Sequence, residues 1–320
     1  MSEDRLIGWL RRQLERRGPD LLGDDAAFLP RESWAVSFDQ QIEGTHFRRG
    51  IAPATVARRL LAVNLSDLAA VGADPAYALL AVAVPGDYPM KPFFRALLDA
   101  SDRHGIVLAG GDVARADTPA FGLTVLGRRH GRWVRRDGGR PGDVLWIGGT
   151  LGESAAGRRL LERGAVPRGR AIELPAGFPS DPVLAAAARR AVRRHLAPRP
   201  QLELGRWLAR RRRAAAIDVS DGLLLDLDRL CRASETGARV DAEALPSALH
   251  FDRLSDYLGS DPVELAAGGG EDYVLLFALP AATEPPPDLG CQRIGRLVSG
   301  RAVRLSGGRS PGHRGWDHLS

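Results

Sequence analysis

Apolar positions in the first half of the chain alternate between the two periods that mark strands and helices. Short apolar runs typical of strands lie at residues 34–38, 77–84, 106–109 and 121–127. Helical spacing is found at 54–71 and 90–104. Pro53 suits the first turn of the earlier helix, and Gly72 suits its end. The pattern predicts an α/β arrangement for this half.

A turn-rich stretch, 137–143, precedes a second half of similar character. Strands are expected at 144–147, 214–219 and 273–279. Helices are expected at 154–163, 181–195 and 201–212, and from Gly222 onward. The tail from Gly300 to Gly315 has the composition of a loop. We therefore expect two domains, residues 1–140 and 141–320, with the boundary near residue 140.

The net charge of +6 comes almost wholly from arginine, because Lys91 is the single lysine. Arginine runs such as 210–213 are one feature of nucleic-acid-binding proteins, but no aromatic residues alternate with them, and solvated helix faces explain them more simply. The N-terminus lacks the apolar core of a signal peptide, and no apolar run reaches the roughly 20 residues that span a bilayer. We expect a cytoplasmic protein with no membrane or nucleic-acid partner.

Aspartates recur where a predicted strand or helix meets a glycine or a small residue. They are Asp24, Asp25, Asp39, Asp67, Asp112, Asp218 and Asp221. Each alone is typical of a turn or a helix cap. Several carboxylates in one pocket repel one another unless a cation lies between them, and oxygen ligands without Cys or His indicate Mg²⁺. In IDVSDGL the strand period places Asp218 and Ser220 on one face, with Asp221 at the N-cap of the next helix.

Other residues leave two interpretations open. Gly110 and Gly111 before Asp112 would let backbone N–H groups approach a phosphate, but such a sequence is more often a turn. His46 and Trp316 taken alone are more typical of packing residues, and Glu271 is equally a capped turn or a ligand at a strand entrance. The absence of GxxxxGK[ST] excludes a P-loop kinase, and no HRD or DFG motif occurs.

Taken in order, these segments resemble the thiamine-monophosphate kinase family, of the superfamily that includes aminoimidazole ribonucleotide synthetase. The matching pieces are GDDAA (23–27), SFDQQIEGTHF (37–47), RRLLAVNLSDLAAVGADP (58–75), GGDV (110–113), RRDGGRPGD (135–143), GTLGESAAG (149–157), IDVSDGLLLDL (217–227) and GGEDYVLLF (269–277). NLSDLAA followed by ADP, together with IDVSDGL and GGEDY, is a specific combination.

The resemblance implies a mixed α/β fold, a homodimer formed by the N-terminal sheets, ATP bound near the dimer interface, and a C-terminal α/β domain that closes over the site. The implied Mg²⁺ ligands are Asp25, Ser37, the main chain of Phe38, Asp39, Asp67, Asp112, Asp218 and Asp221. The implied ATP contacts are Gly111, Asp112, Arg136 and Ser220. The implied contacts to thiamine phosphate are His46, Glu271 and Trp316.

Four positions depart from the family pattern: Phe38 stands where Thr is usual, Gln40 and Gln41 follow Asp39, and Val113 makes GGDV where GGDT is usual. Phe38 offers a metal only its carbonyl oxygen. The expected reaction is in-line transfer from ATP to an already ionised phosphate, held by several Mg²⁺ ions, so no catalytic side chain is required. The rivals are another ATP-dependent enzyme of the superfamily, such as an aminoimidazole ribonucleotide or selenophosphate synthetase, and a non-enzymatic nucleotide sensor or RNA-binding protein.

Overall fold

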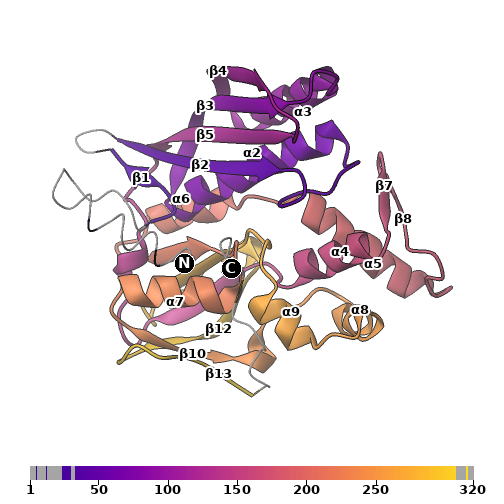
Figure 1. Cartoon of the computed structure of the whole chain (residues 1–320). Coiled ribbons are helices and arrows are strands. Elements are labelled where there is room, and N and C mark those ends of the chain that lie inside the picture. The colour runs from indigo at the N-terminus through magenta and orange to yellow at the C-terminus, as the bar shows by residue number, and fades with distance from the viewer. Residues whose placement is uncertain (1–4, 6–11, 13–23, 30–32, 308–314, 316–320) are drawn as a thin grey trace.

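A computed structural model describes residues 24–29 and 33–307, together with Arg5, Arg12 and Gly315. Two β-sheets lie in separate halves of the molecule, and helices cover each of them (Figure 1). The first sheet is built from residues before 130 and the second from residues after 143. Both sheets contain parallel and antiparallel strand pairs, which confirms the predicted mixed α/β fold. A domain boundary near residue 140 stays a prediction.

The first sheet has the strand order β1–β2–β5–β3–β4. These strands are β1 (Ala27–Phe28), β2 (Trp34–Ile42), β5 (Ala120–Arg129), β3 (Ala73–Val84) and β4 (Val107–Arg115). Only the β3–β4 pair is parallel among the described strands of this sheet. Helices α2 (Pro53–Ala70) and α3 (Met90–His104) pack on one face, where Leu80 and Val82 are buried.

The opposite face of the first sheet lies open. Because side chains alternate along a strand, this open face carries Phe38, Tyr77, Leu79 and Asp112. The Phe38 ring lies across Gly122, where an added Cβ would come within 2.7 Å of it. Exposed apolar side chains gathered on one sheet face are typical of a protein interface.

The second sheet has the order β13–β10–β12–β6–β11–β9. These strands are β13 (Val303–Ser306), β10 (Gly237–Asp241), β12 (Cys291–Val298), β6 (Val144–Gly148), β11 (Leu275–Leu279) and β9 (Ala215–Asp218). Its helices are α6 (Leu202–Ala209), α7 (Leu223–Ala233) and α9 (Pro262–Gly268). The interior strand β11 is buried along its whole length, as a strand covered on both faces must be.

A separate helical cluster lies at one end of this second sheet. It consists of α4 (Glu153–Glu162), α5 (Pro182–Leu196) and α8 (Phe251–Leu258), with the hairpin β7 (Val166–Arg168) and β8 (Ala171–Glu173) projecting from it (Figure 1). Short 3₁₀ turns occur at Arg136–Gly138, Ala242–Ala244 and Pro287–Leu289. Asp181 caps α5 by accepting hydrogen bonds from the main-chain N–H groups of Val183 and Leu184.

Helix α2 joins the two halves. One side packs on β2, β3 and β5, and another contacts α6, β9 and β11. At Gly205 in α6 the two helix backbones come so close that an added Cβ would lie 2.2 Å from the main-chain oxygen of Ala69. Glycine at this position therefore fixes how closely the halves approach.

Several predicted elements end elsewhere in the structure. Helix α6 stops at Ala209, so the arginine run 210–213 lies outside it. The strand expected at 106–109 continues to Arg115 and includes Gly110–Asp112, so the interpretation of GGD as a turn is wrong. The tail expected to be a loop contains β13. Within the described part of the chain, no helix has the length and apolar character needed to cross a membrane.

Gly205→Ala is expected to lower the free energy of unfolding by about 1–3 kcal/mol, although alanine favours helices, because the methyl group collides with the Ala69 carbonyl. Urea denaturation measures the change. Gly86→Ala is the control, since no atom lies within 4 Å of its added Cβ, and it should change stability by less than about 0.5 kcal/mol. Equal effects in the two variants would contradict the close approach.

Candidate active site

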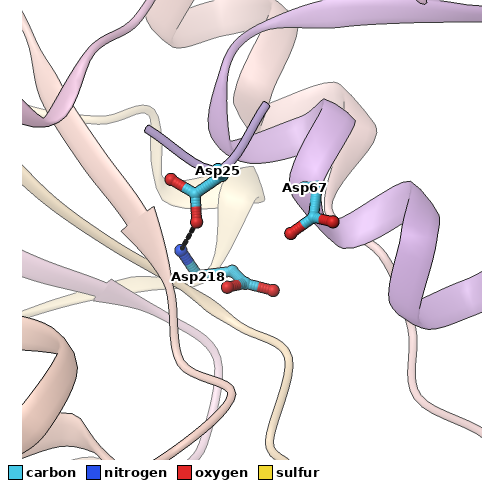
Figure 2. A group of neighbouring side chains, drawn as sticks. All are labelled: Asp25, Asp67 and Asp218. Carbon is cyan, nitrogen blue, oxygen red and sulfur yellow. Dashed lines mark hydrogen bonds between the residues drawn. The ribbon is translucent and has the colours of Figure 1, made fainter. Parts of the chain in front are cut away.

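Three aspartates from three separate segments converge between the two sheets. Asp25 lies just before β1, Asp67 lies on α2, and Asp218 ends β9 (Figure 2). One carboxylate oxygen of each lies within 4.8 Å of the others. The main-chain N–H of Asp218 also donates to Asp25 Oδ1 at 3.4 Å. The predicted convergence of these carboxylates is therefore present in the fold.

Strand β2 brings two further predicted residues to this cluster. The Ser37 hydroxyl donates to Asp67 Oδ2 at 2.5 Å. The main-chain N–H of Asp39 donates to the side-chain oxygen of Asn64 at 2.9 Å. Asn64 is fully buried, and its own amide donates to the carbonyl of Leu60 at 2.8 Å. Asn64 thus fixes the backbone at Asp39. In the sequence it is one of several polar residues of α2, so no local pattern indicates this role.

Burial and mutual repulsion act together on the cluster. Burial raises the pKa of Asp67 well above its usual value, and the neighbouring charges of Asp39 and Asp218 raise it further. Burial likewise raises the pKa of Asp218, with Asp25 adding to the shift. Buried carboxylates at such distances favour a proton or a cation between them.

Arg136 offers positive charge at the edge of the cluster. Its Nη2 lies 3.0 Å from Asp25 Oδ1, and its Nε lies 3.2 Å from Asp25 Oδ2, a two-point contact. The main-chain N–H of Arg136 donates to Asp24 Oδ1 at 2.7 Å. The two neighbouring aspartates therefore have different tasks: Asp24 fixes the turn that carries Arg136, and Asp25 faces Asp67 and Asp218.

A further buried carboxylate, Asp226, shapes the turn after β9. Its Oδ2 accepts hydrogen bonds from the main-chain N–H groups of Ser220, Asp221 and Gly222 at 3.0–3.1 Å. Burial raises the pKa of Asp226 to about 7. Arg229 contacts both Asp226 and Asp221. The N-cap of α7 is Gly222, so the prediction of Asp221 as the cap is wrong; Asp221 stands one residue earlier, paired with Arg229.

Three adjoining cavities run from the aspartates into the helical cluster. The first, about 270 Å³, is lined by Asp25, Phe38, Asp39, Asp67, Arg136, Asp218, Ser220 and Asp221. The next, about 90 Å³, is lined in part by Ser220, Asp221 and Glu271. The third, about 380 Å³, is lined by apolar side chains including Ile51, Val56 and Leu196 and by the charged side chains of Arg48, Arg59, Arg158, Glu162 and Glu271. His46 borders all three. Its Nδ1 accepts from the main-chain N–H of Ile42 at 3.1 Å, which orients the ring.

Two predicted nucleotide contacts lie apart from this cleft. Gly111 and Asp112 are on β4, and β5 and β3 separate that strand from β2. At the usual spacing of strands, β4 is about 14 Å from β2. A single copy of the described chain therefore does not bring Asp112 beside Asp39. Trp316 lies outside the described residues.

Comparison with known proteins gives a consistent result. Residues 23–129 match the family model of the AIR synthase related protein, N-terminal domain. The thiamine-monophosphate kinase of Salmonella typhimurium is 37% identical over 86% of this chain and 80% of its own length. That of Aquifex aeolicus is 29% identical over 100% of this chain and 98% of its own. The solved structure of AaThiL complexed with AMPPCP and TMP superimposes with a TM-score of 0.86, at 28% identity, over 99% of this chain and 97% of that one.

Asp67→Asn is expected to raise the stability of the protein in EDTA by about 0.5–2 kcal/mol, because it removes one of the mutually repelling charges. The pKa of Asp67 is higher in the folded protein than the value of about 4 that an aspartate has in the unfolded chain. Ionising Asp67 therefore lowers the free energy of unfolding as the pH rises above about 4. The stabilisation should therefore fade as the pH falls toward 4. Thermal unfolding between pH 4 and 8 measures it.

Mg²⁺ provides the matching control. It should raise the unfolding temperature of the wild-type protein and do so less for Asp67→Asn, since ligand binding stabilises the folded state. A variant that is less stable than wild type in EDTA at pH 8 would show that the carboxylates do not repel one another as described.

Proposed function

The chain belongs to the thiamine-monophosphate kinase family, and we propose on this premise that it transfers the γ-phosphoryl group of ATP to thiamine phosphate, giving ADP and thiamine diphosphate. The observation that carries the proposal is the cleft itself. A carboxylate cluster suited to a metal-bound triphosphate is joined through a small cavity to a larger one, whose walls combine apolar side chains with arginines and two carboxylates, Glu162 and Glu271. The relative AaThiL has been solved with AMPPCP and TMP together, which supports a site for two phosphorylated ligands.

The chemistry of the donor set fits Mg²⁺. Carboxylates of Asp25, Asp67 and Asp218 offer closely spaced oxygen ligands, with Ser37 beside them, and Mg²⁺ prefers a few carboxylates together with phosphate oxygens. We assign the metal-binding role to these residues, with the Phe38 carbonyl and the side chains of Asp39, Asp112 and Asp221 as further ligands. Bound Mg²⁺ supplies charge neutralisation for the transferring phosphoryl group.

The protein's own groups hold the two anions in line. Ser220 and Arg136 border the carboxylate cavity, where they can contact the triphosphate. His46 lies where this cavity meets the acceptor cavity, so it is placed to orient the phosphate of thiamine phosphate. That phosphate is already ionised and attacks directly, which requires no general base. Glu271 faces the remainder of the acceptor, whose thiazolium ring carries a positive charge.

We further propose that two copies of the chain pair through their open faces in the cytoplasm. Phe38, Tyr77 and Leu79 expose apolar surface that a partner sheet would cover. Asp112 lies on the same face. Pairing of the sheets would bury Asp112 near the interface, where the family resemblance expects ATP. This arrangement would give a role to an aspartate that one copy leaves apart from the cleft.

Purified protein with ATP and Mg²⁺ is expected to release ADP when thiamine phosphate is added, and to form thiamine diphosphate in equal amount. Free thiamine and aminoimidazole precursors serve as control acceptors. Asp218→Asn should lower kcat by about a hundredfold or more, because a carboxamide is a poor Mg²⁺ ligand, while the fold is retained. Turnover with a different acceptor and none with thiamine phosphate would overturn the proposed function.

Leu79→Arg is expected to convert a dimer into a monomer in sedimentation velocity experiments, since it places a charge on the open face. Leu98→Arg is the matched control. Leu98 is exposed to nearly the same degree, 46% against 45%, but it lies on α3, away from the open face. A wild-type protein that sediments as a monomer, or two variants that dissociate equally, would contradict the proposed interface.

A further inference from the structure

Arg59 is a fully buried arginine at the junction of the two halves. It belongs to α2, and only 2% of its surface is exposed. Its Nε donates to Gln41 Oε1 at 3.1 Å, and its Nη1 donates to the main-chain oxygen of His195. Its Nη2 pairs with the carboxylate of Glu271. The guanidinium also lies over the Tyr273 ring, 5.8 Å from its centre.

These partners come from both halves of the molecule. Gln41 is on β2 of the first sheet, His195 is on α5, and Glu271 lies in the loop before β11. A buried guanidinium is costly unless a carboxylate and further acceptors satisfy it. Glu271 supplies the opposite charge here, so the position of its side chain depends on Arg59.

The loop that carries Glu271 is held in an unusual conformation. Glu271 has φ 60° and Tyr273 has φ 49°, values that non-glycine residues seldom adopt. Main-chain hydrogen bonds from Glu271 to Ser220 and from Tyr273 to Val219 hold the loop against the turn after β9. The Glu271 side chain is 26% exposed and borders two of the cavities.

Both carboxylate oxygens of Glu271 have a neighbour. Oε1 meets Arg59, and Oε2 lies 3.5 Å from His195 Nδ1. His195 Nδ1 in turn lies 3.1 Å from the Ser154 hydroxyl. The carboxylate therefore has a defined orientation toward the acceptor cavity before any ligand enters it.

We infer that Arg59 is a positioning residue for the acceptor: it holds the Glu271 carboxylate at the cavity wall and ties acceptor recognition to the docking of the two halves. The inference rests on the proposed function and deepens it. Arg59 is expected to act through Glu271 and so to affect the affinity for thiamine phosphate more than that for ATP.

The charges around Glu271 support this role. Burial would raise its pKa, but Arg59 on α2 and, with smaller effect, His195, Arg158 and His46 on α5, α4 and the loop after β2 bring it below its usual value. His195 is neutral at pH 7, because burial lowers its own pKa to about 4. Arg59 is therefore the principal cation that keeps Glu271 ionised and attractive to a positively charged ring.

Steady-state kinetics of Arg59→Met, Arg59→Lys and the control Arg206→Met test the inference. Arg206 on α6 also joins the halves, through a 2.6 Å contact with Asp74 at the start of β3. It does not line any of the three cavities described above. Arg59→Met should raise KM for thiamine phosphate about tenfold and KM for ATP less than about twofold. Arg59→Lys should raise KM for thiamine phosphate less than Arg59→Met does, because it keeps the charge but not the planar set of donors. Arg206→Met should leave both KM values unchanged.

A double variant separates positioning from packing. If Arg59 acts through Glu271, Arg59→Met should add little to the rise in KM caused by Glu271→Gln alone. An equal rise in both KM values, or full additivity with Glu271→Gln, would overturn the inference. If Arg59→Met does not fold, the ratio of the two KM values is measured instead in Arg59→Lys and in the double variant, which has no unpaired charge.

A failure of the proposed function can be distinguished from a failure of the positioning role of Arg59. Wild-type protein that does not use thiamine phosphate would refute the proposed function. The positioning role is then tested by substrate-free unfolding at pH 7. Arg59→Met with Glu271→Gln should be more stable than Arg59→Met alone, because the double variant no longer contains a partly buried carboxylate without its arginine. Equal stability of the two proteins would overturn the positioning role.

Discussion

The repulsion between Asp25, Asp67 and Asp218 is the interaction on which the rest of the site depends. These carboxylates belong to a loop, a helix and a strand that are distant in sequence, and they meet only because α2 packs on both sheets. The close approach at Gly205 sets that packing. Burial of the apolar cores thus offsets the repulsion between these like charges, an arrangement typical of sites that bind a cation.

Much of the fold was predictable where the apolar pattern was long and regular. Helices α2, α3 and α5 and strands β2, β3 and β5 follow from it with ends displaced by a few residues. Strands β10 and β13 were not foreseen, because they are short and carry arginines at exposed positions, Arg239 and Arg304. Helices α8 and α9 were missed because each is only about two turns long. Gly110 and Gly111 suggested a turn, but both lie within β4, with a φ of 156° that residues with side chains rarely adopt.

The residue types of the site could be read from the sequence, but their pairings could not. Asp25, Asp67 and Asp218 were identified by their place beside small residues, and the fold brings them together. The contact between Arg59 and Glu271 spans 212 positions, and no local pattern announces it. Residues whose role is to hold others, such as Asn64 and Asp226, look in sequence like ordinary members of their helices.

The three amide hydrogen bonds to Asp226 separate two properties of the turn after β9. Its backbone course is set by a side chain inside α7, whereas its chemistry resides in the side chains of Ser220 and Asp221. Descendants of such a chain could exchange those two side chains, and with them the ligand or metal preference, without rebuilding the backbone beneath. Because Asp226 holds the backbone, substitutions at Ser220 and Asp221 can change the chemistry of the turn while its conformation is kept.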